Sequence, residues 1–506
     1  MVTNDDAASS GGSLRSRLGR TFWALNSVEM LERLAYFSVR AVVPVYIMQA
    51  DDPGGLHLTA AHKGTIYAWW FVFQSILPMF TGGYADRYGY KKTMAFSVAL
   101  NVLGYVLMAF AREYWAFFAA IMVLATGTAF FKPSIQGSLA QILTKDISSV
   151  GWGIFYWVVN LGGLAGPLVA RAVLGHPHTA EAWRNLFLAS AAFTSLNLLL
   201  MMSFKDQPSG ASKTESALQV LKRTLVNILE PRLVAWLLIM SCFWLMMYQL
   251  WDLHPNFITD WVDSSSTARA LHHLPNPAYF TTETPRGLQV PQELLLSVNA
   301  GLIILLMVPV SWLVRRIRTL TSMLIGMGVA TGGILVAGLT ADGWVLILGI
   351  VLFSLGEMLT GPKKNEYLGL IAPPGKKGLY LGYVNIPVGI GGFIGSKMAG
   401  YIYGNYGEKA VLALKYLATR APGHEDVDWN GSVATLERAV GVSRSDAFAR
   451  LMERTDLDAA HATRLLWDTY HPQWAVWLPF AAIGVLAVIA LAIFGRMARR
   501  WSDMNA

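Results

Sequence analysis

Long apolar runs separated by shorter polar segments dominate the chain. A helix needs about 20 largely apolar residues to cross roughly 30 Å of hydrocarbon. Runs that satisfy this length lie at residues 22–48, 63–84, 91–111, 114–142, 148–171, 183–204, 232–261, 291–313, 319–340, 342–372, 377–405 and 472–497. The pattern predicts an all-α polytopic membrane protein with 12 transmembrane helices.

Basic residues are concentrated in alternate loops. Arg87 lies in the second loop, Arg315 and Arg316 lie in the eighth, and Arg496 follows the last run. Cytoplasmic loops of membrane proteins carry an excess of Lys and Arg. We therefore expect a multi-pass protein of the plasma (inner) membrane with both termini in the cytoplasm.

Three long polar connections divide the apolar runs. We expect a disordered cytoplasmic tail at 1–20, an N-terminal six-helix half at 21–204, a cytoplasmic linker at 205–231, a C-terminal six-helix half at 232–497 and a cytoplasmic tail at 498–506. Two halves of six helices around a central loop are typical of the major facilitator fold. In that fold the substrate binds near the bilayer midplane, between halves that rock against each other.

The C-terminal half carries external insertions at 262–290 and 406–471. The second insertion is too polar to span a membrane. Short amphipathic helices are predicted at 432–440, 443–454 and 456–469, with Ser443 and Asp456 as N-caps. The insertion is either a small external cap or a passive addition.

Composition agrees with the membrane interpretation. The 506 residues are 54% hydrophobic and only 14% charged, whereas soluble proteins are about 25% charged. The net charge of +8 lies in short loops, so it favours membrane topology and gives no reason to expect a nucleic-acid partner. Cys242 is the single cysteine, and the spacing of Cys and His predicts no metal site.

The first apolar run contains a stripe of charge. Glu29, Glu32, Arg33, Tyr36 and Arg40 follow steps of three and four, so most of them share one helix face. Ionisable residues inside a membrane are costly and usually functional. The stripe favours a water-filled cavity; a purely structural ion pair between helices is the alternative.

Further charges lie in the fourth and tenth runs. Lys132 precedes Pro133, and we expect a carboxylate of the first helix to be its partner. Glu357 shares a face with Gly361 and Lys364. A cavity with Lys132 and Arg33 on one side and Glu357 on the other suits a zwitterion. Alternatively, Glu357 is simply neutralised by Lys364 or by another helix.

Several motifs resemble those of the proton-dependent oligopeptide transporter family. The segment from Glu29 to Phe37 resembles its first-helix motif Glu-x-x-Glu-Arg-Phe-x-Tyr-Tyr, and Phe130-Phe131-Lys132-Pro133 resembles its fourth-helix Phe-Lys-Pro. The stretch 155–162 resembles its fifth-helix motif, and 82–92 resembles the cytoplasmic loop motif of the major facilitator superfamily. The resemblance extends over the first eleven helices and leaves out 406–471.

This resemblance implies roles for particular residues. Proton coupling is assigned to Glu29, Glu32, Arg33 and Lys132. Substrate binding is assigned to Arg33, Tyr36, Lys132, Asn160, Asn299 and Glu357, with Glu357 receiving a peptide ammonium. Asp86 and Arg87 have the gating role of the cytoplasmic loop.

The chain also departs from the family. Tyr248 stands where helix seven often has an acidic residue, and we expect Asp252, one turn later, to pair with Arg40 in an outer gate. Val384 replaces a pocket tryptophan. Helix ten carries Lys363, Lys364 and Glu366 where the family is mostly apolar, and Lys397 has no assigned role.

These observations favour a proton-coupled symporter of di- or tripeptides or similar small amphoteric solutes. The alternatives are an exporter or carrier of another small metabolite, and a non-transporting membrane receptor. No nucleotide-binding loop, metal constellation or activated nucleophile points to an enzyme. Protons are the only coupling ion expected, with no cofactor; the partners are the substrate and the lipid bilayer, and the oligomeric state is left open.

Overall fold

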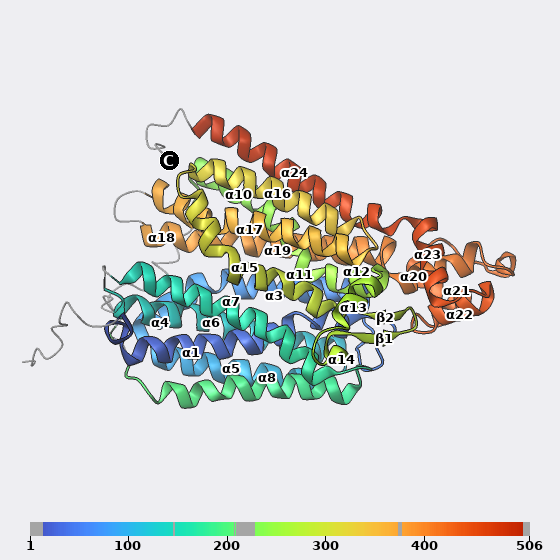
Figure 1. The fold of residues 1–506 in the computed structure, drawn as a ribbon, viewed down its shortest axis with the longest axis horizontal. Coiled ribbons are helices and arrows are strands. Elements are labelled where there is room, and N and C mark those ends of the chain that lie inside the picture. The colour runs from blue at the N-terminus through green and yellow to red at the C-terminus, as the bar shows by residue number, and fades with distance from the viewer. Residues whose placement is uncertain (1–13, 145–146, 207, 209–227, 373–376, 499–506) are drawn as a thin grey trace, which may run out of the picture.

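The computed structural model describes residues 14–144, 147–206, 208, 228–372 and 377–498. It is an elongated bundle whose long helices run roughly along one axis (Figure 1). Most of the predicted linker at 205–231 lies outside the described residues, as do residues 1–13 and 499–506 of the predicted tails.

The first half contains eight helical pieces. They are α1 (Leu14–Arg40), α2 (Val43–Met48), α3 (Ala60–Ile76), α4 (Pro78–Tyr88), α5 (Tyr90–Phe110), α6 (Tyr114–Ile142), α7 (Ser148–Leu174) and α8 (Ala180–Met201). Proline cannot donate a backbone hydrogen bond, so it is tolerated in the first turn after a break, at Pro44 in α2 and at Pro78 in α4. The predicted disordered tail at 1–20 is wrong for its last residues, because α1 begins at Leu14 and kinks at Gly19.

The second half is built in the same way. Its long helices and their short extensions are α10 (Pro231–Met247), α11 (Gln249–Asp252), α12 (His254–Trp261), α15 (Gln292–Val314), α16 (Thr319–Gly338), α17 (Gly343–Ile371), α18 (Lys377–Gly382), η1 (Tyr383–Asn385), α19 (Ile386–Tyr406) and α24 (Pro472–Ala498). Every predicted span therefore has a helical counterpart among the described residues, although α1 begins at Leu14, well before the predicted start at residue 22.

Nine of the membrane-length segments among the described residues are apolar enough to cross a bilayer by composition alone. Three more segments occupy predicted spans but are shorter or less apolar, each for a physical reason. α1 carries the charged stripe, α3 and α4 are separated at Pro78, and α19 is rich in glycine. With these three included, the predicted all-α fold of 12 transmembrane helices is confirmed.

The first external insertion contains two short helices and a hairpin. α13 (Ser265–Leu271) and α14 (Pro277–Phe280) precede β1 (Thr282–Thr284) and β2 (Gly287–Gln289), which pair antiparallel. The sequence did not predict this hairpin, because each strand has only three residues and no clear alternation.

The second insertion folds into a helical unit at one end of the bundle, and we call its helices α20–α23 the cap (Figure 1). It contains α20 (Lys409–Thr419), η2 (His424–Asp426), η3 (Val433–Thr435), α21 (Leu436–Val440), α22 (Ala447–Thr455) and α23 (Ala459–Tyr470). Helix α20 was not predicted, because its apolar face continues the preceding span.

Both predicted caps of this insertion are wrong. The α23 N-cap is Asp458, whose carboxylate accepts from His461 N at 2.8 Å, while Asp456 ends α22 with a left-handed φ of 53°. Asp446, three residues after Ser443, precedes α22.

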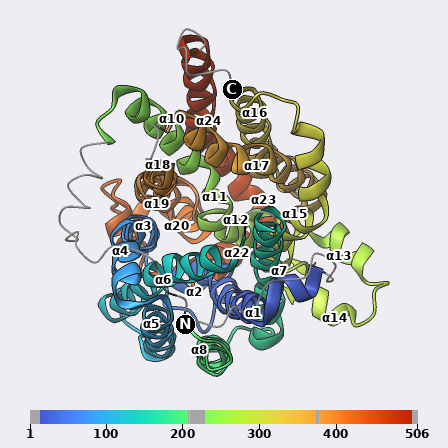
Figure 2. The same cartoon turned by 90° about the vertical axis from the view of Figure 1, so that its left-hand side faces the viewer.

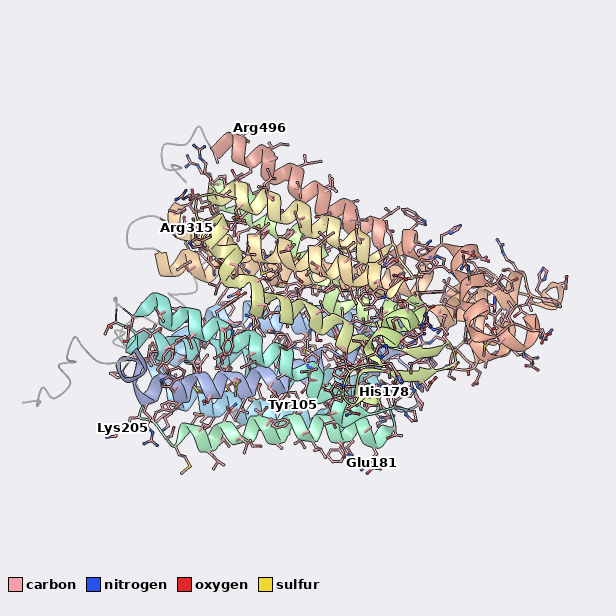
Figure 3. The ribbon with its side chains drawn as sticks, viewed as in Figure 1. Tyr105, His178, Glu181, Lys205, Arg315 and Arg496 are labelled. Atoms are coloured by element: carbon pink, nitrogen blue, oxygen red, sulfur yellow. The ribbon has the colours of Figure 1, made fainter. Side chains whose placement is uncertain are left out.

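The two ends of the bundle differ in charge. Lys205, Arg315 and Arg496 lie at one end, which we call the basic end (Figure 3). His178 and Glu181 lie at the opposite end, on the side of the cap, and we call this the cap end. This separation is the one that the loop charges predicted.

Viewed from the basic end, the helices of the two halves form two groups (Figure 2). The halves meet where α3 packs on α19 and α7 packs on α15. A Cβ on Gly400 would lie 2.6 Å from Ala60 O, and one on Gly64 would lie 2.5 Å from Ser396 O. Small residues let these two helices touch backbone to backbone, a common packing mode in membranes.

Candidate functional site

The charged stripe of α1 forms one buried cluster. Glu29, Glu32 and Arg33 are only 4%, 2% and 5% exposed. Arg33 Nε lies 3.3 Å from Glu29 Oε1, and the Arg33 guanidinium also forms an ion pair with Glu32. A single cation is thus shared between two carboxylates, so a proton on either carboxylate would leave Arg33 paired with the other alone.

The stripe is held in place by α7. A Cβ on Gly162 would lie 2.6 Å from Arg33 Cβ, and one on Gly166 would lie 2.6 Å from Ser38 N. Only glycine permits this approach, so the fifth-helix motif fixes the face of α1 that turns inward. Tyr36 continues the stripe, and its hydroxyl donates to Gln74 Oε1 of α3 at 2.8 Å.

Lys132 lies near this cluster but makes no direct ion pair with it among the described residues. It interacts electrostatically with Arg33, Glu32 and Glu29. Both carboxylates have Arg33 as their ion-pair partner, so the predicted direct pair of Lys132 with an α1 carboxylate is replaced by a longer-range attraction.

Glu357 is anchored in the second half. The Asn299 amide of α15 donates to Glu357 Oε2 at 3.0 Å and to Ser354 Oγ at 2.9 Å. Lys364, two turns further along α17, attracts Glu357, and its Nζ lies 4.1 Å from the ring centroid of Trp244. Asn299, predicted as a substrate contact, is thus also the residue that orients Glu357.

The predicted residues of the two halves share one central region. Tyr156 of α7 interacts with Glu357 across the interface, and it also bonds Asn160. Asn160 itself donates to Tyr156 O at 2.9 Å, within its own helix. Lys132 and Lys364 repel each other from opposite halves. The stripe, Lys132 and Glu357 therefore face a common centre.

The halves are joined at the cap end by a buried ion pair. Lys63 Nζ lies 3.0 Å from Asp252 Oδ1, with side chains 1% and 0% exposed. Ser396 Oγ donates to the same carboxylate, and Lys63 also bonds Asn256 Oδ1 at 3.2 Å. Asp252 is therefore placed at the contact between the halves.

The predicted partner of Asp252 is wrong. Arg40 does not form its ion pair, because the Arg40 guanidinium lies over aromatic rings, 4.1 Å from the Tyr67 centroid and 4.5 Å from that of Trp70. A guanidinium stacks well on aromatic faces, whereas the point charge of Lys63 fits the enclosed carboxylate.

A second layer closes the cap end further out. Gln49 Nε2 donates to Asp260 Oδ1 at 2.7 Å, and Asn256 Nδ2 donates to Pro44 O at 3.0 Å. Arg171 of α7 donates to three carbonyl groups of the first external insertion, among them Thr281 O at 2.8 Å. These bonds between the halves all lie on the side of the cap.

Lys397, which had no assigned role, belongs to the same interface. Its Nζ donates to Thr65 Oγ1 of α3 at 2.7 Å. It therefore links the two helices that already touch at Gly64 and Gly400.

Two loops of the first half are fixed by an acidic residue at the cap end. Asp52 accepts from Trp183 Nε1 at 2.9 Å, and its other oxygen lies 2.7 Å from His178 Nδ1. Burial lowers the pKa of His178, but the hydrogen bond and charge of Asp52 outweigh it, so the pKa lies above its usual range.

The predicted gating residues Asp86 and Arg87 lie at the basic end of α4. Asp86 Oδ1 accepts from the Tyr90 hydroxyl at 2.7 Å, and the Arg87 guanidinium lies 5.9 Å from the Tyr88 ring centroid. Gly89 between them and α5 has a φ of 99°, which makes the sharp turn possible. Neither contact reaches the second half, so these residues are removed from the central cluster.

Several residues of the central site and of the interface between the halves were not predicted from the sequence. They are Gln49, Lys63, Gln74, Tyr156, Asn256 and Asp260. One signal for Lys63 was present: it stands at the predicted external end of a span, where Lys is unusual. The amides gave no signal, because Asn and Gln are common near helix ends.

Among the described residues, no group of three or more His, Cys, Asp or Glu side chains is placed to hold a metal ion. The cluster described above consists of ion pairs, amides and aromatic rings.

A model of the Major Facilitator Superfamily matches residues 27–396, which is most of the chain. The chain belongs to this superfamily. This major facilitator is 30% identical over 156 residues to the "Uncharacterized transporter YclF" of Bacillus subtilis, a match that covers 30% of the chain and 31% of the relative. It is 23% identical to "Multidrug resistance protein MdtH" of Proteus mirabilis, over 76% of the chain and 87% of the relative.

Solved structures share its fold at low identity. A mutant of the nucleoside transporter NupG aligns with a TM-score of 0.67 and 11% identity, covering 94% of this chain and all (100%) of the other. A POT family transporter in complex with 5-aminolevulinic acid aligns with a TM-score of 0.62 and 15% identity, covering 95% and 96%. The family and fold identify this major facilitator as a membrane transporter and not as an enzyme.

Proposed function

We propose that this major facilitator couples the downhill movement of protons to the transport of a small amphoteric solute, such as a di- or tripeptide. The observation that carries the proposal is the buried trio of Glu29, Glu32 and Arg33, with Lys132 nearby and Glu357 in the opposite half. Its support is that a membrane interior tolerates such charges when they serve transport.

The trio explains coupling in physical terms. With both carboxylates ionised, Arg33 is shared between them and is held in place. Protonation of Glu32 removes one of the two attractions, so Arg33 and Lys132 become free to attract the carboxylate of a substrate. Substrate and proton then enter the cluster together, and the Asn299-bound Glu357 receives the ammonium of the substrate.

The closure at the cap end can be related to one conformation of the transport cycle. We propose that the basic end is cytoplasmic, because Lys205, Arg315 and Arg496 lie there. Since the bonds between the halves described above lie at the cap end, the conformation is then closed to the outside. Transport requires the Lys63–Asp252 contact to break as the halves rock.

The experiment is uptake of a labelled dipeptide into proteoliposomes that hold the full-length chain. An inward gradient of about one pH unit drives about tenfold accumulation per coupled proton. We expect Glu32→Gln to abolish accumulation yet retain exchange of labelled for unlabelled dipeptide, because binding survives while coupling is lost. Exchange also shows that the variant is folded.

The matched control is Glu181→Gln, a glutamate with a 73% exposed side chain at the cap end. It should accumulate dipeptide like the wild type. Gradient-dependent accumulation that persists in Glu32→Gln would refute the coupling scheme.

A second function is favoured by the similarity to MdtH, which extends over 76% of the chain. In this reading the protein exports a different metabolite, and helix α17 with its two adjacent lysines selects it. Gradient-driven efflux of a solute without any dipeptide uptake would support it. Binding of a ligand without flux in either direction would instead indicate a receptor.

A further inference from the structure

Two lysines from opposite halves face the same central region. Lys132 stands on α6 and Lys364 on α17, and both are half-buried. Each is attracted by carboxylates at longer range, Lys364 by Glu357 and Lys132 by Glu32 and Glu29, but neither has a carboxylate within ion-pair distance among the described residues. An ammonium group in a membrane interior is costly when no carboxylate pairs with it directly, and a bound anion would relieve that cost.

The position of Lys364 is determined by its surroundings. Its Nζ lies 4.1 Å from the Trp244 ring centroid, a contact that stabilises a cation without neutralising it. The adjacent Lys363 behaves differently, because its Nζ lies 2.9 Å from Glu366 Oε2 and the Glu366 side chain is 46% exposed. Lys363 is thus neutralised by a carboxylate at the periphery, whereas Lys364 has an aromatic ring and no ion-pair partner among the described residues.

The balance of charge in the centre changes with coupling. Glu29, Glu32 and Glu357 supply three negative charges. Arg33, Lys132 and Lys364 supply three positive charges. When one carboxylate of α1 takes up a proton, the centre has an excess positive charge. A zwitterionic solute with one carboxylate and one ammonium adds no net charge, so it leaves this excess in place.

We propose that Lys364 is a second anion-binding residue, so that the preferred substrate carries an amine and two carboxylates, as an acidic dipeptide does. This inference rests on the proposed transport function. One carboxylate meets Arg33 and Lys132, the second meets Lys364, and the ammonium meets Glu357. The net negative charge of such a solute matches the excess positive charge of the protonated centre.

The test compares two dipeptides that differ in charge and hardly in size, alanyl-glutamate and alanyl-glutamine. Both are offered to proteoliposomes of the full-length chain under an inward proton gradient. We expect the wild type to prefer alanyl-glutamate by about tenfold in kcat/KM, since charge-assisted bonds are markedly stronger than neutral ones. Lys364→Gln should lose this preference by reducing uptake of the acidic peptide alone.

The neighbouring lysine provides the matched control, and Lys363→Gln should keep the preference. Lys364→Arg retains the positive charge and should keep it as well, which separates loss of charge from loss of folding. Equal reduction of both peptides by Lys364→Gln would mean that Lys364 is structural and would overturn the inference.

Uptake by the wild type alone distinguishes failure of the proposed role of Lys364 from failure of the proposed transport function. Gradient-driven uptake of both dipeptides without preference for the acidic one overturns only the role of Lys364. No gradient-driven uptake of either dipeptide overturns the proposed function and this inference with it.

Discussion

At the scale of single residues, the surroundings decide what an ionisable side chain does. Lys63 is enclosed and paired with Asp252, Lys363 is paired with the half-exposed Glu366, and Lys364 lies over the Trp244 ring. All three are lysines in or beside apolar runs. Their different roles follow from the carboxylate or ring that each meets, because a buried ammonium requires a partner and an exposed one does not.

Glu408 is the titratable residue of the cap with the clearest consequence. Burial raises its pKa, the guanidinium of Arg444 lowers it, and the carboxylates of Asp260, Glu437 and Asp51 raise it, which brings the pKa to about 7. An exposed glutamate has a pKa of about 4.3. Folding therefore favours the protonated form of Glu408.

The sign of the pH effect follows. A folded-state pKa above the unfolded value contributes stability that is fully present below about pH 4.5 and is lost as pH rises through about 7. We expect the melting temperature to be lower at pH 8 than at pH 5.5, and Glu408→Gln to reduce this difference. The measurement is thermal unfolding of the purified protein at the two pH values.

The control for this titration is Glu453→Gln. Glu453 lies in the same cap, its side chain is 66% exposed, and its partner is Arg450 of the same helix. This variant should keep the pH dependence of the wild type. An unchanged pH dependence in Glu408→Gln would show that another group is responsible.

At the scale of elements, the halves are joined by helices that touch at small residues and are fixed by polar bonds. Gly64 and Gly400 bring α3 and α19 together, and Lys63, one residue away, reaches Asp252 of α11. Close packing gives this contact its shape, and the ion pair gives it a specific register.

The Lys63–Asp252 pair allows a direct test of this element. Removing one partner of a buried ion pair costs about 3–5 kcal/mol, because an uncompensated charge stays buried. We therefore expect Asp252→Asn to lower the melting temperature clearly. The double variant Lys63→Met with Asp252→Leu should recover most of the loss, because both charges are gone.

The comparison is made by thermal unfolding in detergent, with accessibility of a thiol introduced at the cap end as a second readout. The single variant should expose that thiol more than the double variant. A single variant as stable as the wild type would mean that the pair contributes nothing to closure at this end.

At the scale of the whole molecule, the cap belongs to the second half but contacts the first. Arg444 Nη2 donates to His57 O at 2.7 Å and to Leu58 O at 2.9 Å, in the loop that precedes α3. The same guanidinium lies 3.0 Å from Glu408 Oε1. The cap therefore takes part in the closure of the cap end, and the proposed rocking of the halves would have to detach it.

A crosslink tests whether this detachment is needed. In a Cys242→Ser background, cysteines replace His57 and Arg444 and are joined by a short thiol crosslinker. We expect dipeptide uptake to fall at least about tenfold on crosslinking, because the halves can no longer separate at the cap end. Uptake is measured in proteoliposomes before and after treatment.

The control joins two positions within one helix of the cap, Arg450→Cys and Glu453→Cys, which already contact each other. This crosslink should leave uptake unchanged. Undiminished uptake with the cap tied to the loop of His57 would contradict a cycle in which the two separate.

The membrane spans, and the end of the bundle at which the basic loops lie, could be predicted because each depends on local properties. The run at 114–142 coincides with α6, and the spans at 91–111 and 319–340 match their helices within two residues. An apolar run of sufficient length forms a helix in a membrane whatever its neighbours are, since the bilayer offers backbone groups no other partner.

The ion-pair partners and helix caps of individual residues could not be predicted in the same way. The sequence predicted Arg40 as the partner of Asp252, and only the packing of α3 against the second half determined that Lys63 reaches it instead. Asp456 was predicted as the cap of α23, but it adopts a left-handed turn at the end of α22, and Asp458 caps α23 instead. In each case, residues of similar chemistry compete, and sequence spacing does not distinguish them.

The sequence by itself determined the number of crossings, the short basic loops that lie at one end, and the presence of charges that a membrane helix would otherwise avoid. These follow from hydrophobicity, charge and helical periodicity, which act over a few neighbouring residues. The tertiary structure alone decided that Lys364 lies over the Trp244 ring, that Asn299 orients Glu357 and that the cap contacts the first half. These relations join residues far apart in the chain, and they exist only because glycine-lined helices approach closely enough to fix which side chains meet.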